Sequence, residues 1–149
     1  MSHLGRPKGF QEEFSLKHIE NKVEDILGVE VKFVSSCIGL EAETAAANLQ
    51  PGEILLLENL RYYEEETDGN VAFAEKLSKL GDIYVNDAFG TAHRAHASTT
   101  IVAQFFENNK CFGHLLAQEI ESIKKVMETG EKPVLAILVD NSLSTTYFN

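Results

Sequence analysis

Residues 51–59 read Pro51-Gly52-Glu53-Ile54-Leu55-Leu56-Leu57-Glu58-Asn59, a turn followed by four large apolar residues and then two polar ones. An apolar run of this length between turn-forming and polar residues is typical of a strand that is buried on both faces. Such strands belong to parallel sheets whose faces are covered by helices, so this segment predicts an α/β fold.

The segments on both sides of this run alternate between helical and strand-like patterns. Residues 16–27 carry apolar side chains at helical spacing between a capping Ser15 and Gly28, and the β-branched run 29–34 comes next. In chain order, the patterns predict helices over 16–27, 41–49, 71–80, 99–106 and 114–127 and strands over 29–34, 54–57, 83–85 and 134–138. This alternation predicts parallel pairing with right-handed crossovers in an open, doubly wound sheet, with ligands bound beyond the carboxyl ends of the strands.

The composition is that of a folded acidic protein. The 149 residues include 13 Lys and Arg against 23 Asp and Glu, a formal net charge of −10, which argues against a nucleic-acid partner. The length predicts one domain. No apolar run approaches the roughly 20 residues needed to cross a bilayer, and the amino terminus has no apolar signal core, so we expect a cytoplasmic protein without a membrane partner.

The two cysteines, Cys37 and Cys111, lie far apart in the sequence. They form no C-x-x-C pattern, so neither a disulfide framework nor a structural zinc site is indicated. We expect both to be small core residues.

Arginine and lysine occupy different parts of the sequence. The three arginines, Arg6, Arg61 and Arg94, each fall in a predicted loop, whereas several lysines lie on predicted helix faces. A guanidinium can hold a phosphate or carboxylate by two parallel hydrogen bonds, which an ammonium cannot do. This arrangement predicts an anion site. The alternative is that each arginine forms a structural salt bridge with a neighbouring acid.

The histidines add to this hypothesis. His3, His93 and His96 lie in the same loops, where an imidazole can donate to phosphate oxygens. His93 and His96 also have a spacing that suits a shared metal ion, but the sequence marks no third ligand, so we expect no metal site. His18 and His114 lie on predicted helices and are expected to be structural or solvated.

Other motifs are weak or absent. The acidic run 64–66 is expected to be a solvated connecting loop, because consecutive carboxylates seldom converge on one cation. The sequence contains no G-x-x-x-x-G-K-[ST] and no G-x-G, and no Ser or Cys lies in a nucleophile elbow. A nucleotide site therefore has no support within these residues, and we assign no catalytic residue.

The sequence also contains three longer motifs, which are Ser2-His3-Leu4-Gly5-Arg6-Pro7, Leu56-Leu57-Glu58-Asn59-Leu60-Arg61-Tyr62-Tyr63 and Tyr84-Val85-Asn86-Asp87-Ala88-Phe89-Gly90-Thr91-Ala92-His93-Arg94-Ala95-His96-Ala97-Ser98. These motifs closely resemble the signatures of the phosphoglycerate kinase family, and they come in the family's order. The resemblance runs from about Ser2 to Leu138. It implies substrate-binding residues at His3, Leu4, Gly5, Arg6, Arg61 and Arg94, with His93 and His96 in supporting roles.

The resemblance implies a three-layer Rossmann-like domain that binds 3-phosphoglycerate or 1,3-bisphosphoglycerate. In the family a hinge joins this domain to a carboxyl-terminal domain that binds magnesium-ATP or ADP. The family's reaction moves a phosphoryl group between 1,3-bisphosphoglycerate and ADP in glycolysis, and full-length members are usually monomeric. Closing the domains would expel water and align donor and acceptor, so catalysis is mainly positioning and charge neutralisation.

The sequence departs from the family pattern at both ends. It starts at the loop 3–6 without the strand that should support it, and after Leu138 it continues with Val139-Asp140-Asn141-Ser142 where the family has two glycines and then a lysine of the nucleotide site. We expect residues 1–138 to be a partial amino-terminal domain, incomplete at its amino terminus. We expect residues 139–149 to be a divergent tail and the nucleotide domain to be absent.

Three hypotheses follow from the resemblance and these departures. The leading one is a fragment of the substrate domain that binds at most 3-phosphoglycerate and is inactive alone. The others are a non-catalytic anion-binding module and a non-functional truncated gene product. Because the missing strands would leave apolar surface uncovered, we also expect association or partial unfolding.

Overall fold

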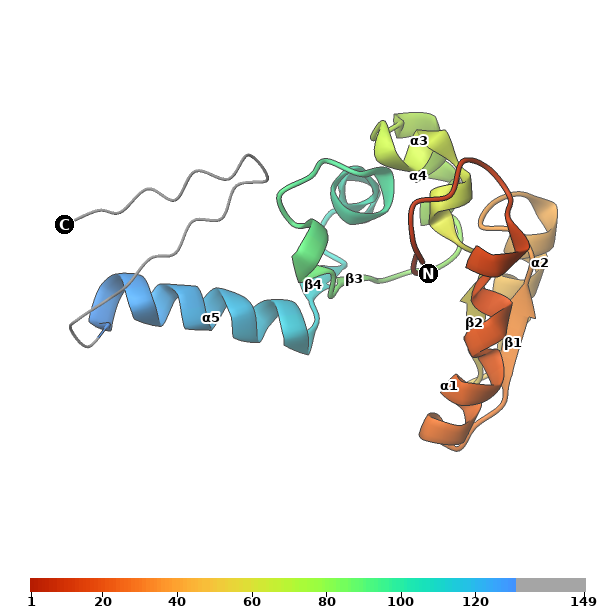
Figure 1. Cartoon of the computed structure of the whole chain (residues 1–149), viewed down its shortest axis with the longest axis horizontal. Helices are drawn as coiled ribbons and strands as arrows, with labels where there is room; N and C mark the ends of the chain where they lie inside the picture. The colour runs from red at the N-terminus through yellow and green to blue at the C-terminus, as the bar shows by residue number, and fades with distance from the viewer. Residues whose placement is uncertain (131–149) are drawn as a thin grey trace.

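A computed structural model describes residues 1–130 of the chain (Figure 1). The α-helices of this part are α1 (Glu20–Leu27), α2 (Leu40–Ala47), α3 (Glu64–Thr67), α4 (Val71–Ser78) and α5 (His114–Thr129). The strands are β1 (Val31–Val34), β2 (Ile54–Leu57), β3 (Tyr84–Asn86) and β4 (Lys110–Phe112). Strands and helices alternate along the chain, which confirms the predicted α/β class.

The strands of the described residues pair in two short parallel sheets. Val31 of β1 lies opposite Ile54 of β2 in the first sheet, and Tyr84 of β3 lies opposite Lys110 of β4 in the second. The parallel pairing agrees with the sequence prediction. Strand β4 was missed, because its three residues are too few to show a periodic pattern.

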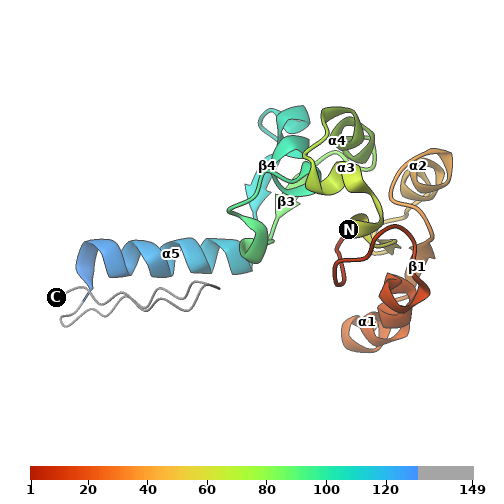
Figure 2. The ribbon, with the colours of Figure 1, turned by 45° about the horizontal axis from the view of Figure 1, so that its top comes forward.

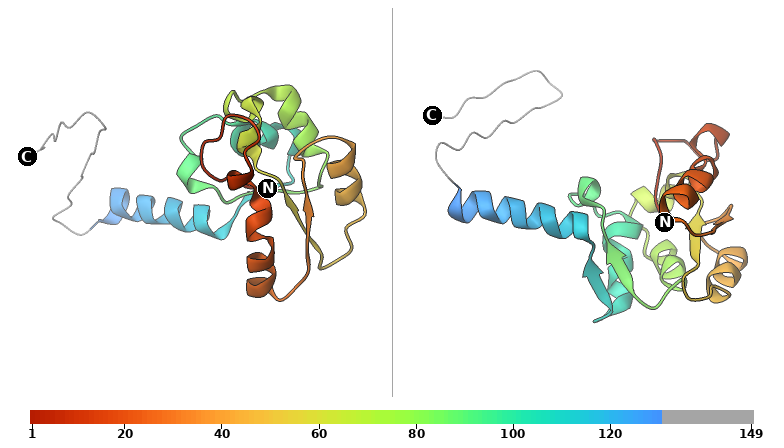
Figure 3. Two further views of the ribbon diagram at one scale, coloured as in Figure 1. Left: turned by 45° about the vertical axis from the view of Figure 1, so that its right-hand side comes forward. Right: turned by 90° about the horizontal axis from the view of Figure 1, so that it is seen from below.

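Helices cover both faces of the first sheet, so the fold is layered. Helices α1 and α2 lie on opposite sides of β1 and β2 (Figures 2 and 3). A cluster of buried side chains joins this sheet to α4 and to the helical turns that follow β3, and it includes Val34, Leu57, Phe73, Leu77 and Val102. Through this core, the segments that follow β2 and β3 are held against one another.

The first predicted helix has the expected cap and the expected end, but its first turn is not α-helical. The Ser15 hydroxyl accepts a hydrogen bond from the backbone N–H of Lys17 at 3.2 Å, and the chain leaves the helix at Gly28, whose φ is 69°. Between them, Leu16–Ile19 form a 3-10 turn before α1 begins.

The helix expected over 99–106 is not an α-helix. Ala97–Ile101 form a π-helical turn, and Val102–Phe106 form a 3-10 turn. Side chains from β3 explain the difference, because the Tyr84 hydroxyl donates to the carbonyl of Ser98 at 2.8 Å and Asn86 Nδ2 donates to the carbonyl of Thr99 at 2.9 Å. These bonds compete with regular helical hydrogen bonding.

Two expectations about burial are wrong. Residues 64–66 do not form a solvated loop, because they belong to α3 and the Glu66 side chain lies inside, where Ser98 donates two hydrogen bonds to its carboxylate. Cys37 is buried as predicted, but Cys111 is exposed, as are all residues of β4. The predicted strand over 134–138 and the tail over 139–149 lie outside the described residues.

Helix α5 projects from the rest of the described structure (Figures 1 and 3). Its first turn is anchored by Asp87, whose Oδ1 accepts a hydrogen bond from the backbone N–H of Leu116 at 2.9 Å. Farther along, the apolar side chains of Ile120, Ile123 and Met127 are exposed. Within residues 1–130, neither α5 nor any other helix combines the length and apolar content needed to cross a bilayer.

Candidate functional site

The structure brings the three arginines of the sequence together. Arg6, Arg61 and Arg94 line one cavity of about 280 Å³, which we call the arginine pocket. Lys8 and Glu64 also line it, so the wall carries four basic side chains and one acidic side chain. A chain with a net charge of −10 therefore concentrates positive charge beyond the carboxyl ends of β2 and β3.

Arg61 reaches the pocket from a 3-10 turn, Leu60–Tyr62, that directly follows β2. Asn59 caps this turn, because its Oδ1 accepts a hydrogen bond from the backbone N–H of Arg61 at 2.9 Å. The Nδ2 of Asn59 donates to the carbonyls of Leu4 at 2.8 Å and Phe14 at 2.9 Å. One fully buried amide thus ties the turn of Arg61 to the loop of Arg6.

The loop of Arg6 is held to the same turn by its backbone. The N–H of Leu60 donates to the carbonyl of Ser2 at 3.2 Å. Ser2 precedes Leu4 in the sequence and Arg6 follows it, so the loop is held at two points before Arg6. Gly5 has a φ of 62°, and a Cβ at this position would meet the ring of Phe14. Leu4 and Gly5 therefore contribute backbone geometry to the site, while the Arg6 side chain is exposed.

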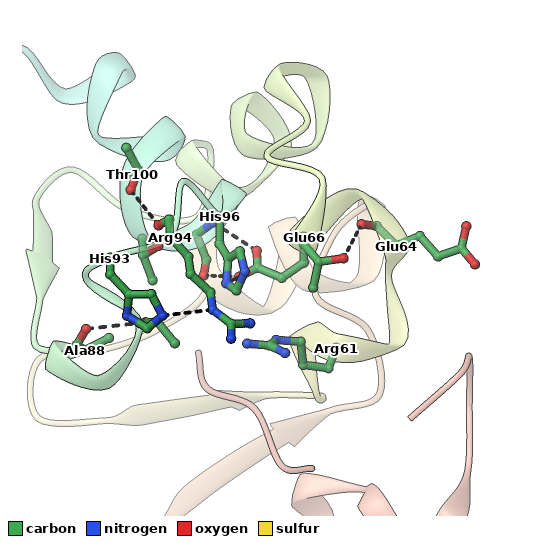
Figure 4. Close-up of polar contacts among 12 residues, drawn as sticks. Arg61, Glu64, Glu66, Ala88, His93, Arg94, His96 and Thr100 are labelled. Carbon is green, nitrogen blue, oxygen red and sulfur yellow. Dashed lines mark hydrogen bonds and ion pairs between the residues drawn. The ribbon is translucent and has the colours of Figure 1, made fainter. Parts of the chain in front are cut away.

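Arg94 enters the pocket from the loop after β3. Its carbonyl accepts a hydrogen bond from the Thr100 hydroxyl at 3.2 Å, and its Nε donates to Nε2 of His93 at 3.1 Å. This bond places the proton of a neutral His93 on Nδ1. The guanidinium ends of Arg94 and Arg61 point toward one another (Figure 4).

Among the described residues, none of the three arginines forms a salt bridge with a neighbouring acid. Within residues 1–130, Lys32 pairs with Glu53, and Glu12 and Glu66 lie 4.0 Å from the rings of His18 and His96. The Nε of Arg61 is buried and has no hydrogen-bond partner in this part of the chain. A buried donor without a partner is costly, so a ligand oxygen would supply a favourable interaction here.

His3 and His96 line a second cavity of about 340 Å³ with Asn86 and Asp87. Burial, and then the positive charge of Arg61, lower the pKa of both imidazoles below the ordinary value of 6.5. These shifts favour the neutral form of both rings, and a neutral imidazole can still donate one hydrogen bond. The Nδ1 of His96 lies 4.0 Å from Oε1 of Glu66.

The remaining histidines take no part in this arrangement. His18 is exposed and its Nε2 lies 2.8 Å from the carbonyl of Glu12, and His114 is an exposed residue at the start of α5. His93 and His96 have separate partners, Arg94 and Glu66. In the described part of the chain, no three His, Cys, Asp or Glu side chains converge as a metal site would require.

Sequence reasoning missed three residues that support the pocket: Glu58, Asn59 and Glu66. Glu58 is 2% exposed and accepts hydrogen bonds from Ser15 Oγ at 2.6 Å and from the N–H of Leu16 at 2.8 Å. Glu58 and Asn59 were marked only by their place directly after a buried strand, and nothing local marked Glu66, because the partners of these side chains lie far away in the sequence.

Parallel strands and covering helices define an α/β domain with an arginine-lined cavity at the strand ends. A sequence model described as phosphoglycerate kinase matches residues 1–146. The chain belongs to the phosphoglycerate kinase family.

Individual relatives agree with this assignment. The chain is 44% identical to a phosphoglycerate kinase of Porphyromonas gingivalis, with 97% of this chain and 40% of that protein aligned. It is 48% identical to one of Dictyoglomus turgidum, with 93% of this chain and 34% of that protein aligned. The chain thus spans little more than a third of the length of these relatives.

Solved structures show the same fold and the same partial coverage. The phosphoglycerate kinase of Coxiella burnetii superposes with a TM-score of 0.72 at 36% identity, over 89% of this chain and 32% of that one. The enzyme of Pyrococcus horikoshii gives a TM-score of 0.73 at 28% identity, over 85% of this chain and 33% of that one. Parallel α/β architecture is therefore shared with family members that are about three times as long.

Proposed function

We propose that this chain provides the 3-phosphoglycerate site of a phosphoglycerate kinase, with the phosphate group held in the arginine pocket. The observation that carries this proposal is the presence of Arg6, Arg61 and Arg94, from three separate loops, in one cavity. Two guanidinium ends that point toward one another repel unless an anion lies between them, and a phosphate offers oxygens to both.

The neighbouring histidines suit the rest of the substrate. Burial lowers the pKa of His3 and of His96, which favours the neutral form in the ligand-free chain, and an imidazole N–H of each would contact the substrate as a hydrogen-bond donor. 3-Phosphoglycerate carries a hydroxyl and a carboxylate beside its phosphate, and both can accept such bonds. The same pocket would take the corresponding phosphate of 1,3-bisphosphoglycerate.

The complete activity requires a second reactant. In the proposed reaction a phosphoryl group moves between 1,3-bisphosphoglycerate and ADP with magnesium, as in glycolysis. The residues described here supply a pocket for one reactant, and phosphoryl transfer depends on holding both in line. We expect the 149-residue polypeptide, expressed by itself, to bind 3-phosphoglycerate without transferring phosphoryl groups.

Calorimetric titration of the polypeptide with 3-phosphoglycerate tests the binding site. Glycerate lacks the phosphate and glycerol 3-phosphate lacks the carboxylate, so the two analogues separate the arginine pocket from the histidine cavity. We expect glycerate to bind far more weakly than glycerol 3-phosphate. Arg61→Gln should abolish binding, whereas Lys22→Gln, an equal loss of charge on an exposed position of α1, should leave it unchanged.

Three outcomes distinguish the hypotheses. Binding of 3-phosphoglycerate above inorganic phosphate supports the substrate site, while equal affinity for any small anion would indicate a general anion-binding module. A polypeptide without a cooperative melting transition would be a product that does not fold. Turnover in a coupled kinase assay by this polypeptide alone would contradict the expectation that it is inactive.

A further inference from the structure

Two buried carboxylates flank Arg61 in the sequence, and the proposed function gives neither a contact with substrate. Glu58 lies three positions before Arg61 and Glu66 five positions after it, and each is 2% exposed. Burying a carboxylate is unfavourable unless hydrogen bonds satisfy it. The partners of each carboxylate therefore show what its burial achieves.

Glu58 holds the segment that carries Arg6. Its Oε2 accepts from Ser15 Oγ at 2.6 Å, and its Oε1 accepts from the backbone N–H of Leu16 at 2.8 Å. A third bond, from the N–H of Asn59 at 2.7 Å, fixes the carboxylate to its own strand end. Ser15 and Leu16 are thereby held at the point where the segment from Arg6 enters the 3-10 turn Leu16–Ile19.

Glu66 holds the loop that carries Arg94 in the same manner. Its Oε1 accepts from Ser98 Oγ at 2.7 Å, and its Oε2 accepts from the backbone N–H of Ser98 at 2.9 Å. Beside this contact, the backbone at Gly69 lies so close to the carbonyl of Ala95 that a Cβ at position 69 would collide with it. Both contacts hold the loop of Arg94 against the segment that follows Arg61.

We infer that Glu58 and Glu66 are positioning residues that set the places of Arg6 and Arg94, respectively, around Arg61. Each accepts a serine hydroxyl and a backbone N–H from the segment it holds. Neither lines the arginine pocket, although Glu66 lines the neighbouring cavity of His3 and His96, so we assign the effect on the phosphate to the arginines. The inference rests on the proposed function for its ligand, but the positioning itself is measurable without one.

Hydrogen exchange tests the positioning in the absence of ligand. Ser98→Ala removes one donor to Glu66 and leaves the carboxylate and the backbone N–H in place, and Ser15→Ala does the same at Glu58. We expect S98A to speed amide exchange over residues 92–98 but not over 14–16, whose backbone N–H groups are hydrogen-bonded, and S15A to do the reverse. Faster exchange in both segments for either variant, or in neither, would overturn the inference.

Double-mutant cycles with 3-phosphoglycerate test the consequence for binding. Glu66→Gln and Glu58→Gln keep the side-chain shape but lose an acceptor, and each should weaken binding by about fivefold or more. The effects of E66Q and Arg94→Lys on the dissociation constant should differ from additivity by about threefold or more, whereas those of E66Q and Arg6→Lys should be additive. E58Q should show the opposite pattern, so each glutamate variant is the matched control for the other.

The outcomes separate this inference from the proposed function. If the arginine variants weaken 3-phosphoglycerate binding but the cycles are additive throughout, the positioning inference is wrong and the binding site stands. If the arginine variants have no effect, the proposed function is wrong, and hydrogen exchange still decides the positioning. Should E58Q or E66Q fail to fold, cycles with S15A and S98A replace them, with the same pattern expected.

Discussion

Replacing Arg61 with lysine keeps the charge of the arginine pocket but removes the planar fork that can bind two phosphate oxygens. The Nε of Arg61 is buried and has no partner among the described residues, so in the wild-type chain this donor is free for the ligand. A lysine at the same position makes a single point contact. The perturbation therefore removes about one hydrogen bond to a charged group.

Such a bond contributes about 1.5–3 kcal/mol, which corresponds to a rise in the dissociation constant of about tenfold to 150-fold. We expect Arg61→Lys to fall in this range for 3-phosphoglycerate, measured by calorimetry at fixed ionic strength. Smaller losses are expected for Arg6→Lys and Arg94→Lys, because both side chains are exposed and already solvated. The melting temperature serves as the control for folding.

A dissociation constant for Arg61→Lys within twofold of the wild-type value would refute this reasoning. It would mean that the ligand recognises charge alone or does not enter the pocket. An equal loss for all three arginine variants, together with a lower melting temperature in each, would indicate a general defect in folding.

Three further predictions concern stability and reactivity. Asn59→Ala should lower the free energy of unfolding by about 2–4 kcal/mol in urea titrations, because it strands two carbonyls and a backbone N–H, whereas Asn48→Ala at an exposed position should change it little. Burial lowers the pKa of His96 below 6.5 in the folded state, so the unfolded chain binds more protons in mild acid. The free energy of unfolding should therefore fall as the pH drops from 7 toward 5, and His96→Gln should make this dependence on pH weaker. Cys111 is exposed and should react at once with an aromatic disulfide reagent, whereas Cys37, whose pKa burial raises to about 12, should react only after denaturation; two thiols titrating together in the native protein would contradict this.

Local patterns were sufficient for the parts of the fold that depend on neighbouring residues. The strand at 54–57 and the helical segment from Ser15 to Gly28 could be predicted, because burial, capping and helix ending each produce a sequence pattern within a few positions. The sequence predicted that the arginines lie in loops at strand ends, where ligands bind in α/β sheets. Their convergence also depends on contacts between loops, because β2 and β3 belong to different sheets and no described strand precedes Arg6.

The parts that could not be predicted depend on partners far away in the sequence. Glu66 lies in a run of three acids and looks solvated, and only Ser98, thirty-two positions away, makes its burial favourable. The turn at residues 97–101 departs from an α-helix because the Tyr84 hydroxyl captures a carbonyl there. No periodicity in a single sequence reports such contacts.

Helix α5 has a physical consequence for how the chain behaves in solution. A helix of 16 residues is close to the length, about 12–15 residues, below which isolated helices are marginal in water. Asp87 secures only its first turn, so the persistence of the later turns depends on whether Ile120, Ile123 and Met127 are covered. The helix content should therefore depend on association. The helical signal in the mean residue ellipticity should increase as the protein is concentrated, and Ile123→Glu should make this signal independent of concentration.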